Sequence, residues 1–181
     1  MNINAAIKKG AEILKKNDIK YPDLDCEILL AKVLKKQRKY LLLNLDKQIH
    51  KENLETYKNL INQRSTGKPI AYLIKKKNFW DSEFIIEEGT LIPRPDTETL
   101  IEATLEIYKN KNYANILDIG VGSGCIILSI LKEKPCFYGK GIDISSKSIS
   151  LSNRNAKRLS IENRVEFIKT DVDNFCIGKY D

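Results

Sequence analysis

The sequence predicts an α/β protein preceded by a helical bundle. From residue 114 onward, short apolar runs alternate with helix-like segments, a pattern typical of parallel β-α-β units. The first 68 residues instead carry apolar side chains at helical spacing. Between these parts lie two β-prone runs. We therefore expect a helical bundle over 1–68, a β-hairpin linker over 69–90 and the first half of a doubly wound, Rossmann-like sheet over 91–181.

Three amphipathic segments predict the N-terminal bundle. Residues 3–16 repeat an apolar side chain every three or four positions. Pro22 can start a second helix, because a proline at the first helical position loses no intrahelical hydrogen bond. A third helix is expected over 51–64, and Gly67 and Pro69 provide the usual glycine-then-proline ending.

The linker is predicted from the runs PIAYLI and FWDSEFII, which the polar KKKN separates. The segment LIPRPDTE at 91–98 follows the hairpin. Pro93 and Pro95 restrict the backbone on either side of Arg94. Pro95 can also begin a helix, with Asp96 favourable in its first turn.

The last part alternates strands and helices in a regular order. Strands are expected for NILDI, FYGKGID and RVEFIKT, and helices for CIILSILKE and SKSISLSNRNAKRL. Strands that are separated by helices form parallel units, and we expect helices on both faces of the sheet.

Composition excludes several classes of protein. No run approaches the roughly 20 apolar residues that span a bilayer, and the N-terminus has no signal-peptide pattern. The four cysteines form no CxxC pair, and the only histidine is His50, in a polar stretch. We therefore expect no metal site, no histidine-based hydrolase and a cytoplasmic location.

Charge is distributed unevenly along the chain. Residues 1–78 hold 18 basic and 8 acidic side chains, whereas residues 79–181 hold 13 and 16. A basic N-terminal part suits an acidic partner or RNA, or it is a solvated helical surface. Because lysines dominate and no aromatic side chains are interleaved, the solvated surface is favoured over direct nucleic-acid binding.

The stretch ILDIGVGSG at 116–124 predicts a cofactor site. A dinucleotide fingerprint would need a glycine at position 125 or 127, where the chain has cysteine and isoleucine. The pattern D-x-G-x-G-x-G instead resembles the first motif of class I methyltransferases, which bind S-adenosyl-L-methionine. This resemblance implies contacts from Gly120, Val121, Gly122, Ser123 and Gly124, because residues without side chains let the backbone approach a ligand. A purely structural turn is the alternative.

Two strand ends extend the expected site. Asp143 stands 19 residues after Gly124, where an acid can accept hydrogen bonds from both ribose hydroxyls. This role is shared with enzymes that bind NAD. In similar methyltransferases the corner at Asp171 and Val172 flanks the adenine. A turn cap is an equal alternative for Asp171.

Several segments together resemble one family. GKPIAYL (67–73), NFW (78–80), LIPRPDTE (91–98) and ILDIGVGSG (116–124) follow the order of the HemK-like glutamine methyltransferases. These enzymes methylate the glutamine amide in the GGQ loop of bacterial peptide-chain release factors. The resemblance implies that residues 1–68 dock the substrate and that release factors are the partners. It places Arg94 near the methionine carboxylate. Alternatively, Arg94 braces its loop through Glu98 or Asp118.

The sequence departs from this family in one respect. Family members hold the acceptor amide with an Asn-Pro-Pro-Tyr motif after the fourth strand, and no such string occurs in these 181 residues. No catalytic residue is therefore assigned. We expect the sheet to be the first half of the family's sheet, with 115–119 as an exposed edge. We also expect the chain to be an inactive fragment that is poorly soluble or oligomeric.

Three function classes remain under comparison. A release factor glutamine methyltransferase leads, and an N6-adenine nucleic-acid methyltransferase is its nearest rival. A fragment that binds S-adenosylmethionine without catalysis is the second class. An NAD-dependent dehydrogenase conflicts with Cys125 and Ile127 in the glycine pattern.

Overall fold

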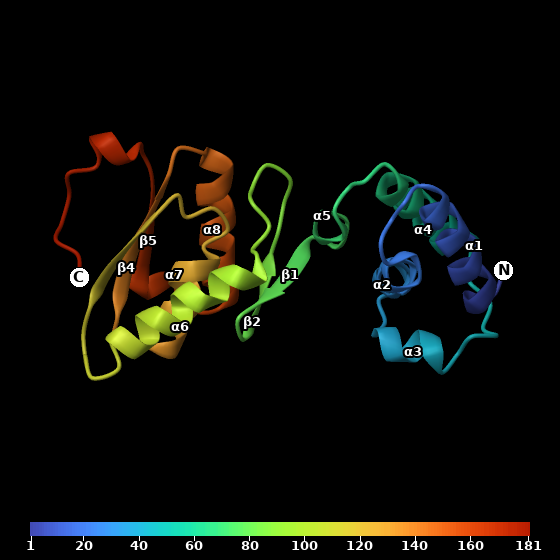
Figure 1. Cartoon of the computed structure of the whole chain (residues 1–181), viewed down its shortest axis with the longest axis horizontal. Helices are drawn as coiled ribbons and strands as arrows, with labels where there is room; N and C mark the ends of the chain where they lie inside the picture. The colour runs from blue at the N-terminus through green and yellow to red at the C-terminus, as the bar shows by residue number, and fades with distance from the viewer. The chain divides into compact units, whose positions relative to one another are not determined.

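The computed structural model describes all 181 residues (Figure 1). The chain divides into two compact units, Met1–Ile74 and Lys75–Asp181. Each unit has its own elements and is described by itself.

The first unit is entirely helical. Its helices are α1 (Ile3–Lys16), α2 (Pro22–Leu34), α3 (Arg38–Leu42), α4 (Lys51–Ser65) and α5 (Ile70–Ile74). The side chain of Asn2 caps α1 by accepting a hydrogen bond from the backbone nitrogen of Ala5. Pro22 is the first residue of α2, as the sequence predicts. No helix of the chain is long and apolar enough to span a membrane.

Helices α1, α2 and α4 enclose the core of the first unit. Leu14, Leu29 and Leu30 are fully buried in it. Arg64 on α4 donates to the Asp25 carboxylate on α2 at 2.6 Å, and its guanidinium also donates to the carbonyl of Lys68. These contacts fix the end of α4 against α2.

The expected hairpin begins later than the sequence suggested. PIAYLI does not form a strand; Ile70–Ile74 is the short helix α5. The cause is local: Pro69 starts a helical turn, and its carbonyl accepts from the backbone nitrogens of Tyr72 and Leu73. The hairpin is instead formed by β1 (Lys76–Phe79) and β2 (Ser82–Ile85), which pair in antiparallel register.

The second unit contains a parallel sheet in the order β3-β4-β5. The strands are β3 (Asn115–Ile119), β4 (Tyr138–Asp143) and β5 (Val165–Lys169). The helices are α6 (Glu98–Ile107), α7 (Cys125–Glu133) and α8 (Ser146–Arg158). The predicted order of strands and helices from residue 114 onward is confirmed, and so is the α/β fold class.

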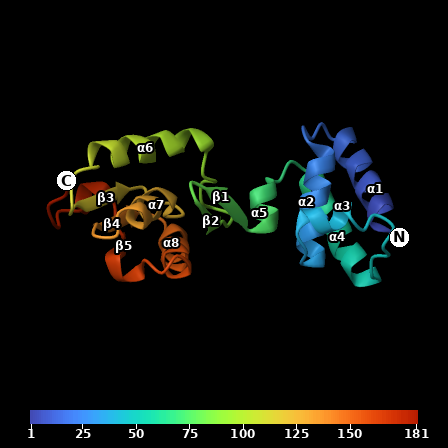
Figure 2. The same ribbon diagram turned by 90° about the horizontal axis from the view of Figure 1, so that it is seen from below.

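The two crossover helices lie on one face of the sheet, which corrects the expectation of helices on both faces. Because β3, β4 and β5 follow one another in a single direction, right-handed crossovers bring α7 and α8 to the same side. Figures 1 and 2 both show them together beside the strands. Strand β3 is an edge of the sheet, as predicted, and its only cross-strand ladder is with β4.

Candidate cofactor site

The glycine loop connects β3 to α7 in a backbone conformation that requires glycine. Gly120, Gly122 and Gly124 all have positive φ, at 77°, 55° and 79°. The carbonyl of Ile142 on β4 accepts from the backbone nitrogens of Gly120 and Val121, at 2.9 and 3.0 Å. The loop is therefore anchored to the neighbouring strand.

The three glycines differ in what lies beside them. A methyl group at Gly120 would meet no atom within 4 Å, and at Gly122 it would meet only the Gly120 oxygen, at 3.9 Å. At Gly124 it would lie 3.0 Å from Leu128 and 3.2 Å from Ser152. The first two glycines thus border open space that a ligand can fill, whereas Gly124 allows close packing against the helices.

Asp143 lies beside this loop, at the end of β4. Its Oδ2 accepts from the backbone nitrogen of Gly122 at 3.0 Å, and its Oδ1 accepts from that of Ser145 at 2.8 Å. Each carboxylate oxygen retains a further lone pair. The site therefore combines a glycine loop with a half-buried carboxylate that can still accept hydrogen bonds from hydroxyl groups.

Asp118 was not among the predicted site residues. It lies on β3, and burial raises the pKa of its carboxyl group to about 6. Its Oδ2 is buried and has no hydrogen-bond partner. A signal was present in the sequence, because an aspartate within an apolar strand is costly without a function.

The third strand brings Asp171 and Val172 to the same edge of the sheet. The Asp171 side chain accepts from the backbone nitrogen of Asp173 at 3.1 Å and caps the turn at Val172–Asn174. The cap is therefore present, and both residues remain exposed. Ile144, which follows Asp143, is also exposed, at 71%. This exposed apolar side chain beside Asp143 is a further candidate contact, which the sequence did not predict.

Arg94 is exposed and makes no ion pair in the structure. Glu98, one of its two expected bracing partners, accepts a hydrogen bond from the backbone nitrogen of Trp80 at 2.8 Å. The Trp80 ring nitrogen in turn donates to Glu133 on α7, at 2.8 Å. LIPRPDTE and NFW are therefore joined through Glu98 and Trp80, and the Arg94 guanidinium is left available.

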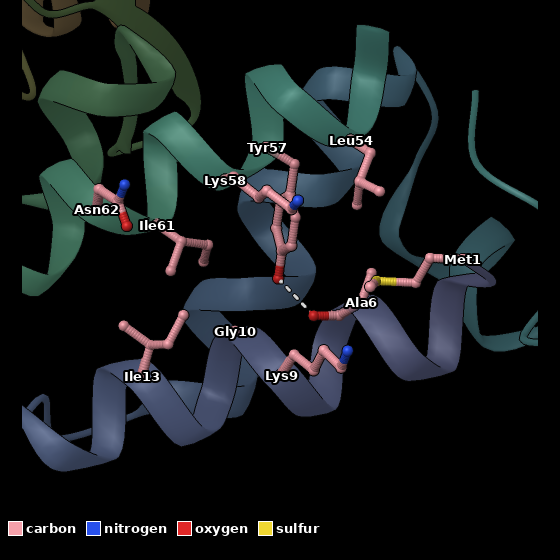
Figure 3. A pocket seen from close by; sticks show the side chains of 10 residues that line it. All are labelled: Met1, Ala6, Lys9, Gly10, Ile13, Leu54, Tyr57, Lys58, Ile61 and Asn62. Carbon is pink, nitrogen blue, oxygen red and sulfur yellow. Dashed lines mark hydrogen bonds between the residues drawn. The ribbon is translucent and has the colours of Figure 1, made fainter. Parts of the chain in front are cut away.

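The first unit has a groove of its own between α1 and α4, with a volume of about 210 Å³ (Figure 3). Apolar groups of Ala6, Tyr57 and Ile61 contribute to its lining, and Lys9 and Lys58 also border it. The Tyr57 hydroxyl donates to the carbonyl of Ala6 at 3.4 Å. The groove thus combines an apolar surface with positive charge.

The family models and the relatives that match this chain all belong to methyltransferases. Residues 5–74 match the family model of the PrmC N-terminal domain, and residues 96–181 match that of the methyltransferase small domain. The release factor glutamine methyltransferase of Buchnera aphidicola subsp. Baizongia pistaciae is 40% identical over 178 residues, covering 96% of this chain and 64% of that protein. The release factor glutamine methyltransferase of Clostridium acetobutylicum is 38% identical over 177 residues, covering 95% of this chain and 60% of that protein. A bifunctional methyltransferase of Rickettsia conorii is 30% identical, covering 99% and 39%.

These matches make the second unit similar to methyltransferase domains. Along nearly its whole length the chain is similar to release factor glutamine methyltransferases, which confirms the resemblance to the HemK-like family. The chain spans between 39% and 64% of the length of the three relatives.

Proposed function

We propose that this chain binds S-adenosyl-L-methionine at the glycine loop. The bound molecule is the methyl donor for the GGQ-loop glutamine of peptide-chain release factors. The observation that carries the proposal is the placement of Asp143 against Gly122, beside two glycines that border open space. The names of the relatives supply the reaction and the substrate.

The residues present suit this cofactor. When bound, S-adenosyl-L-methionine would supply an activated methyl group, which its sulfonium sulfur carries. We propose that Asp143 accepts hydrogen bonds from the ribose hydroxyls. The backbone of Gly120, Val121 and Gly122 would border the ligand, and Ser123 and Gly124 would complete this loop. The unpartnered oxygen of Asp118 suits an ammonium group at the methionine end.

Three further residues complete the proposed contacts. Asp171 and Val172 would flank the adenine, together with the exposed Ile144. Arg94 would pair with the methionine carboxylate, and its lack of an ion pair in the structure supports this role over bracing through Glu98.

The first unit is the proposed docking part for the release factor. Residues 1–74 carry 15 basic and 8 acidic side chains, and the groove between α1 and α4 adds apolar surface. Positive charge steers an acidic partner, and apolar contact then holds it. We place this partnership in the cytoplasm, where translation occurs.

We assign donor binding and partner docking to these residues, and not the positioning of the acceptor. The 181 residues contain no Asn-Pro-Pro-Tyr string, to which the resemblance assigns the acceptor amide. An amide nitrogen is a poor nucleophile, so its methylation depends on positioning. We therefore expect no methyl transfer by the 181-residue chain alone.

Calorimetric titration of the purified chain with S-adenosylhomocysteine tests the donor site. We expect saturable binding of one equivalent and no binding of NAD. Binding of NAD in its place would overturn the cofactor assignment.

The partner is tested by passing purified release factor, and separately a DNA duplex, over the immobilised chain. Binding of release factor but not of DNA supports the proposal, and the reverse result favours the nucleic-acid alternative. Transfer of a labelled methyl group to the release factor would overturn the expected inactivity.

A further inference from the structure

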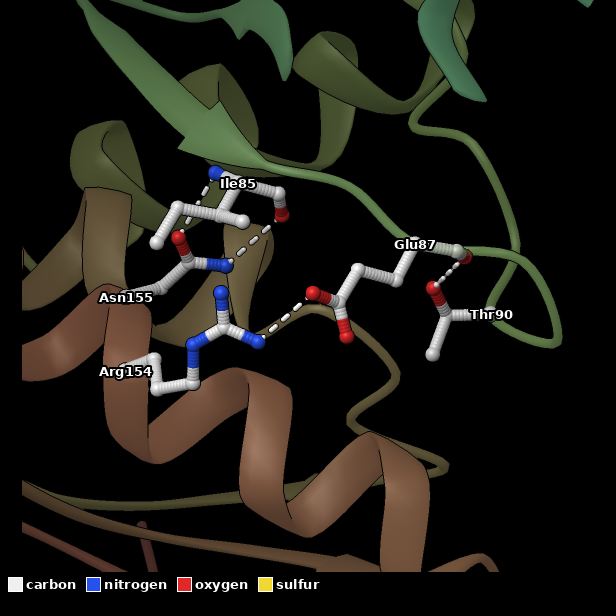
Figure 4. Close-up of polar contacts among 5 residues, drawn as sticks. All are labelled: Ile85, Glu87, Thr90, Arg154 and Asn155. Carbon is white, nitrogen blue, oxygen red and sulfur yellow. Dashed lines mark hydrogen bonds and ion pairs between the residues drawn. The ribbon is translucent and has the colours of Figure 1, made fainter. Parts of the chain in front are cut away.

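Asn155, in the C-terminal half of α8, contacts two segments that are distant in the sequence. Its Nδ2 donates to the carbonyl of Ser123 in the glycine loop at 2.8 Å, and to the carbonyl of Ile85 in the hairpin at 3.1 Å. Its Oδ1 accepts from the backbone nitrogen of Ile85 at 2.7 Å. Figure 4 shows this paired contact with Ile85.

The amide of Asn155 is fully buried, and every hydrogen atom it can donate is used. A buried polar side chain costs free energy unless its hydrogen bonds are made. An apolar residue would fill this place more simply, so the asparagine indicates that the Ser123 and Ile85 backbone groups need a partner here.

Helix α8 supports the site at more than one point. Its cap residue Ser145 donates to the Asp143 carboxylate at 2.8 Å. Ser152, one helical turn before Asn155, lies close to Gly124. A methyl group added at Gly124 would be 3.2 Å from the Ser152 side chain. The same helix thus contacts both the acid and the loop that we propose to hold the cofactor.

The other contacts between α8 and the hairpin are of a different kind. Arg154 pairs with Glu87 at 2.7 Å, and Arg158 pairs with Glu83 (Figure 4 shows the former). These side chains are between 32% and 48% exposed, and exposed ion pairs contribute little to stability. Neither pair contacts the glycine loop. Asn155 therefore differs from them in joining the hairpin to the loop.

We propose that Asn155 is a positioning residue for the donor site. It holds the carbonyl of Ser123, and with it the left-handed conformations of Gly122 and Gly124, in the arrangement that the cofactor requires. The same amide joins this loop to the backbone of Ile85 in the hairpin. This inference rests on the proposed function, because it concerns the same glycine loop.

The test compares Asn155→Ala with the wild type and with Phe84→Leu. Phe84 is fully buried and packs edge-to-face against Phe79 in the hairpin, so its truncation lowers the stability of the second unit and leaves the hydrogen bonds of Asn155 in place. Affinity for S-adenosylhomocysteine is measured by calorimetry at a temperature where circular dichroism shows each variant folded. We expect Asn155→Ala to bind about tenfold more weakly, a ratio that corresponds to about 1.4 kcal/mol. Phe84→Leu should keep wild-type affinity.

A second readout separates positioning from general stability. The backbone nitrogen of Gly124 donates to the carbonyl of Val121 at 2.8 Å, within the loop. Hydrogen exchange at this amide, followed by NMR, should accelerate in Asn155→Ala and not in Phe84→Leu. If Asn155→Ala does not fold, Asn155→Ser takes its place with the same expectations.

The outcomes are distinct. Wild-type affinity in the Asn155 variant, or equal weakening in Phe84→Leu, would overturn the positioning role and leave the proposed function standing. Absence of binding in the wild type itself would overturn the proposed function, and the positioning role with it.

Discussion

The Asp143 carboxylate accepts a hydrogen bond from the backbone nitrogen of Gly122 at 3.0 Å, although 21 residues separate them. This bond joins the end of β4 to the turn that follows β3. The acid and the loop proposed to share one ligand therefore already lie in contact. Such preorganisation lowers the cost of ordering a site when its ligand binds.

Replacement of Gly122 by alanine should weaken binding of S-adenosylhomocysteine at least about tenfold. A left-handed conformation costs an alanine about 1 kcal/mol, and the new methyl group would enter the space proposed for the ligand. Gly67→Ala is the matched control. Gly67 also has positive φ, and a methyl group there would meet no atom within 4 Å, but this residue lies in the first unit. Calorimetry showing equal affinities for both variants would contradict the proposed loop contact.

Asp143→Asn should lower both stability and affinity. The new amide group must turn a donor toward either the Gly122 or the Ser145 nitrogen, each of which is also a donor. We expect a loss of about 1–3 kcal/mol in the free energy of unfolding. Affinity for S-adenosylhomocysteine should fall in parallel. Thermal melts and calorimetry check this against Glu162→Gln, an exposed acid that should leave both quantities unchanged.

Arg94→Ala should reduce affinity for S-adenosylhomocysteine without lowering the melting temperature, since Arg94 makes no ion pair in the structure. Methylthioadenosine lacks the amino-acid carboxylate, so it should bind wild type and variant equally. An unchanged affinity for S-adenosylhomocysteine would remove Arg94 as the carboxylate partner.

Asp118 should make stability depend on pH. Its folded-state pKa is raised from 3.8 to about 6, so the folded state binds more protons than the unfolded state between these values. The free energy of unfolding should therefore fall as pH rises from 4 to 6, by at most about 3 kcal/mol. Urea unfolding of Asp118→Asn should lack this fall. Parallel curves for both proteins would show that another group is responsible.

Gly10→Ala should destabilise the first unit, although alanine is the better helix former. A methyl group there would lie 2.5 Å from the Tyr57 hydroxyl and 2.8 Å from the Cys26 sulfur. Overpacking of this kind costs about 1–3 kcal/mol, against a gain in helix propensity of about 1 kcal/mol. Urea unfolding should show a net loss. Glu12→Ala, an exposed change on the same helix, should stay within about 0.5 kcal/mol of wild type.

Local patterns in the sequence were enough to predict most elements. The strand at Asn115–Ile119 and the helix starting at Pro22 follow from periodicity and from proline chemistry, which act over a few residues. PIAYLI failed as a strand because its apolar content gave no period, while Pro69 favoured a helical turn.

The glycine loop and Asp143 could be proposed as a site from the sequence because their spacing along the chain is itself the signal. Asn155 carried no such signal, since its partners Ser123 and Ile85 lie 32 and 70 residues away. A buried asparagine on a polar-looking helix becomes visible only when the fold brings its partners together. The same holds for the side of the sheet that α7 and α8 cover, which depends on strand order and not on either helix alone.

The division of the chain after Ile74 has a consequence for how such proteins can change. The helical unit has a hydrophobic core of its own, and the glycine loop with its acid lies wholly in the second unit. Under the roles that we propose for the two units, substitutions on the helical surface can therefore alter which partner is recognised while the chemistry of the methyl donor is conserved. Selectivity and reactivity can evolve at separate rates in one polypeptide.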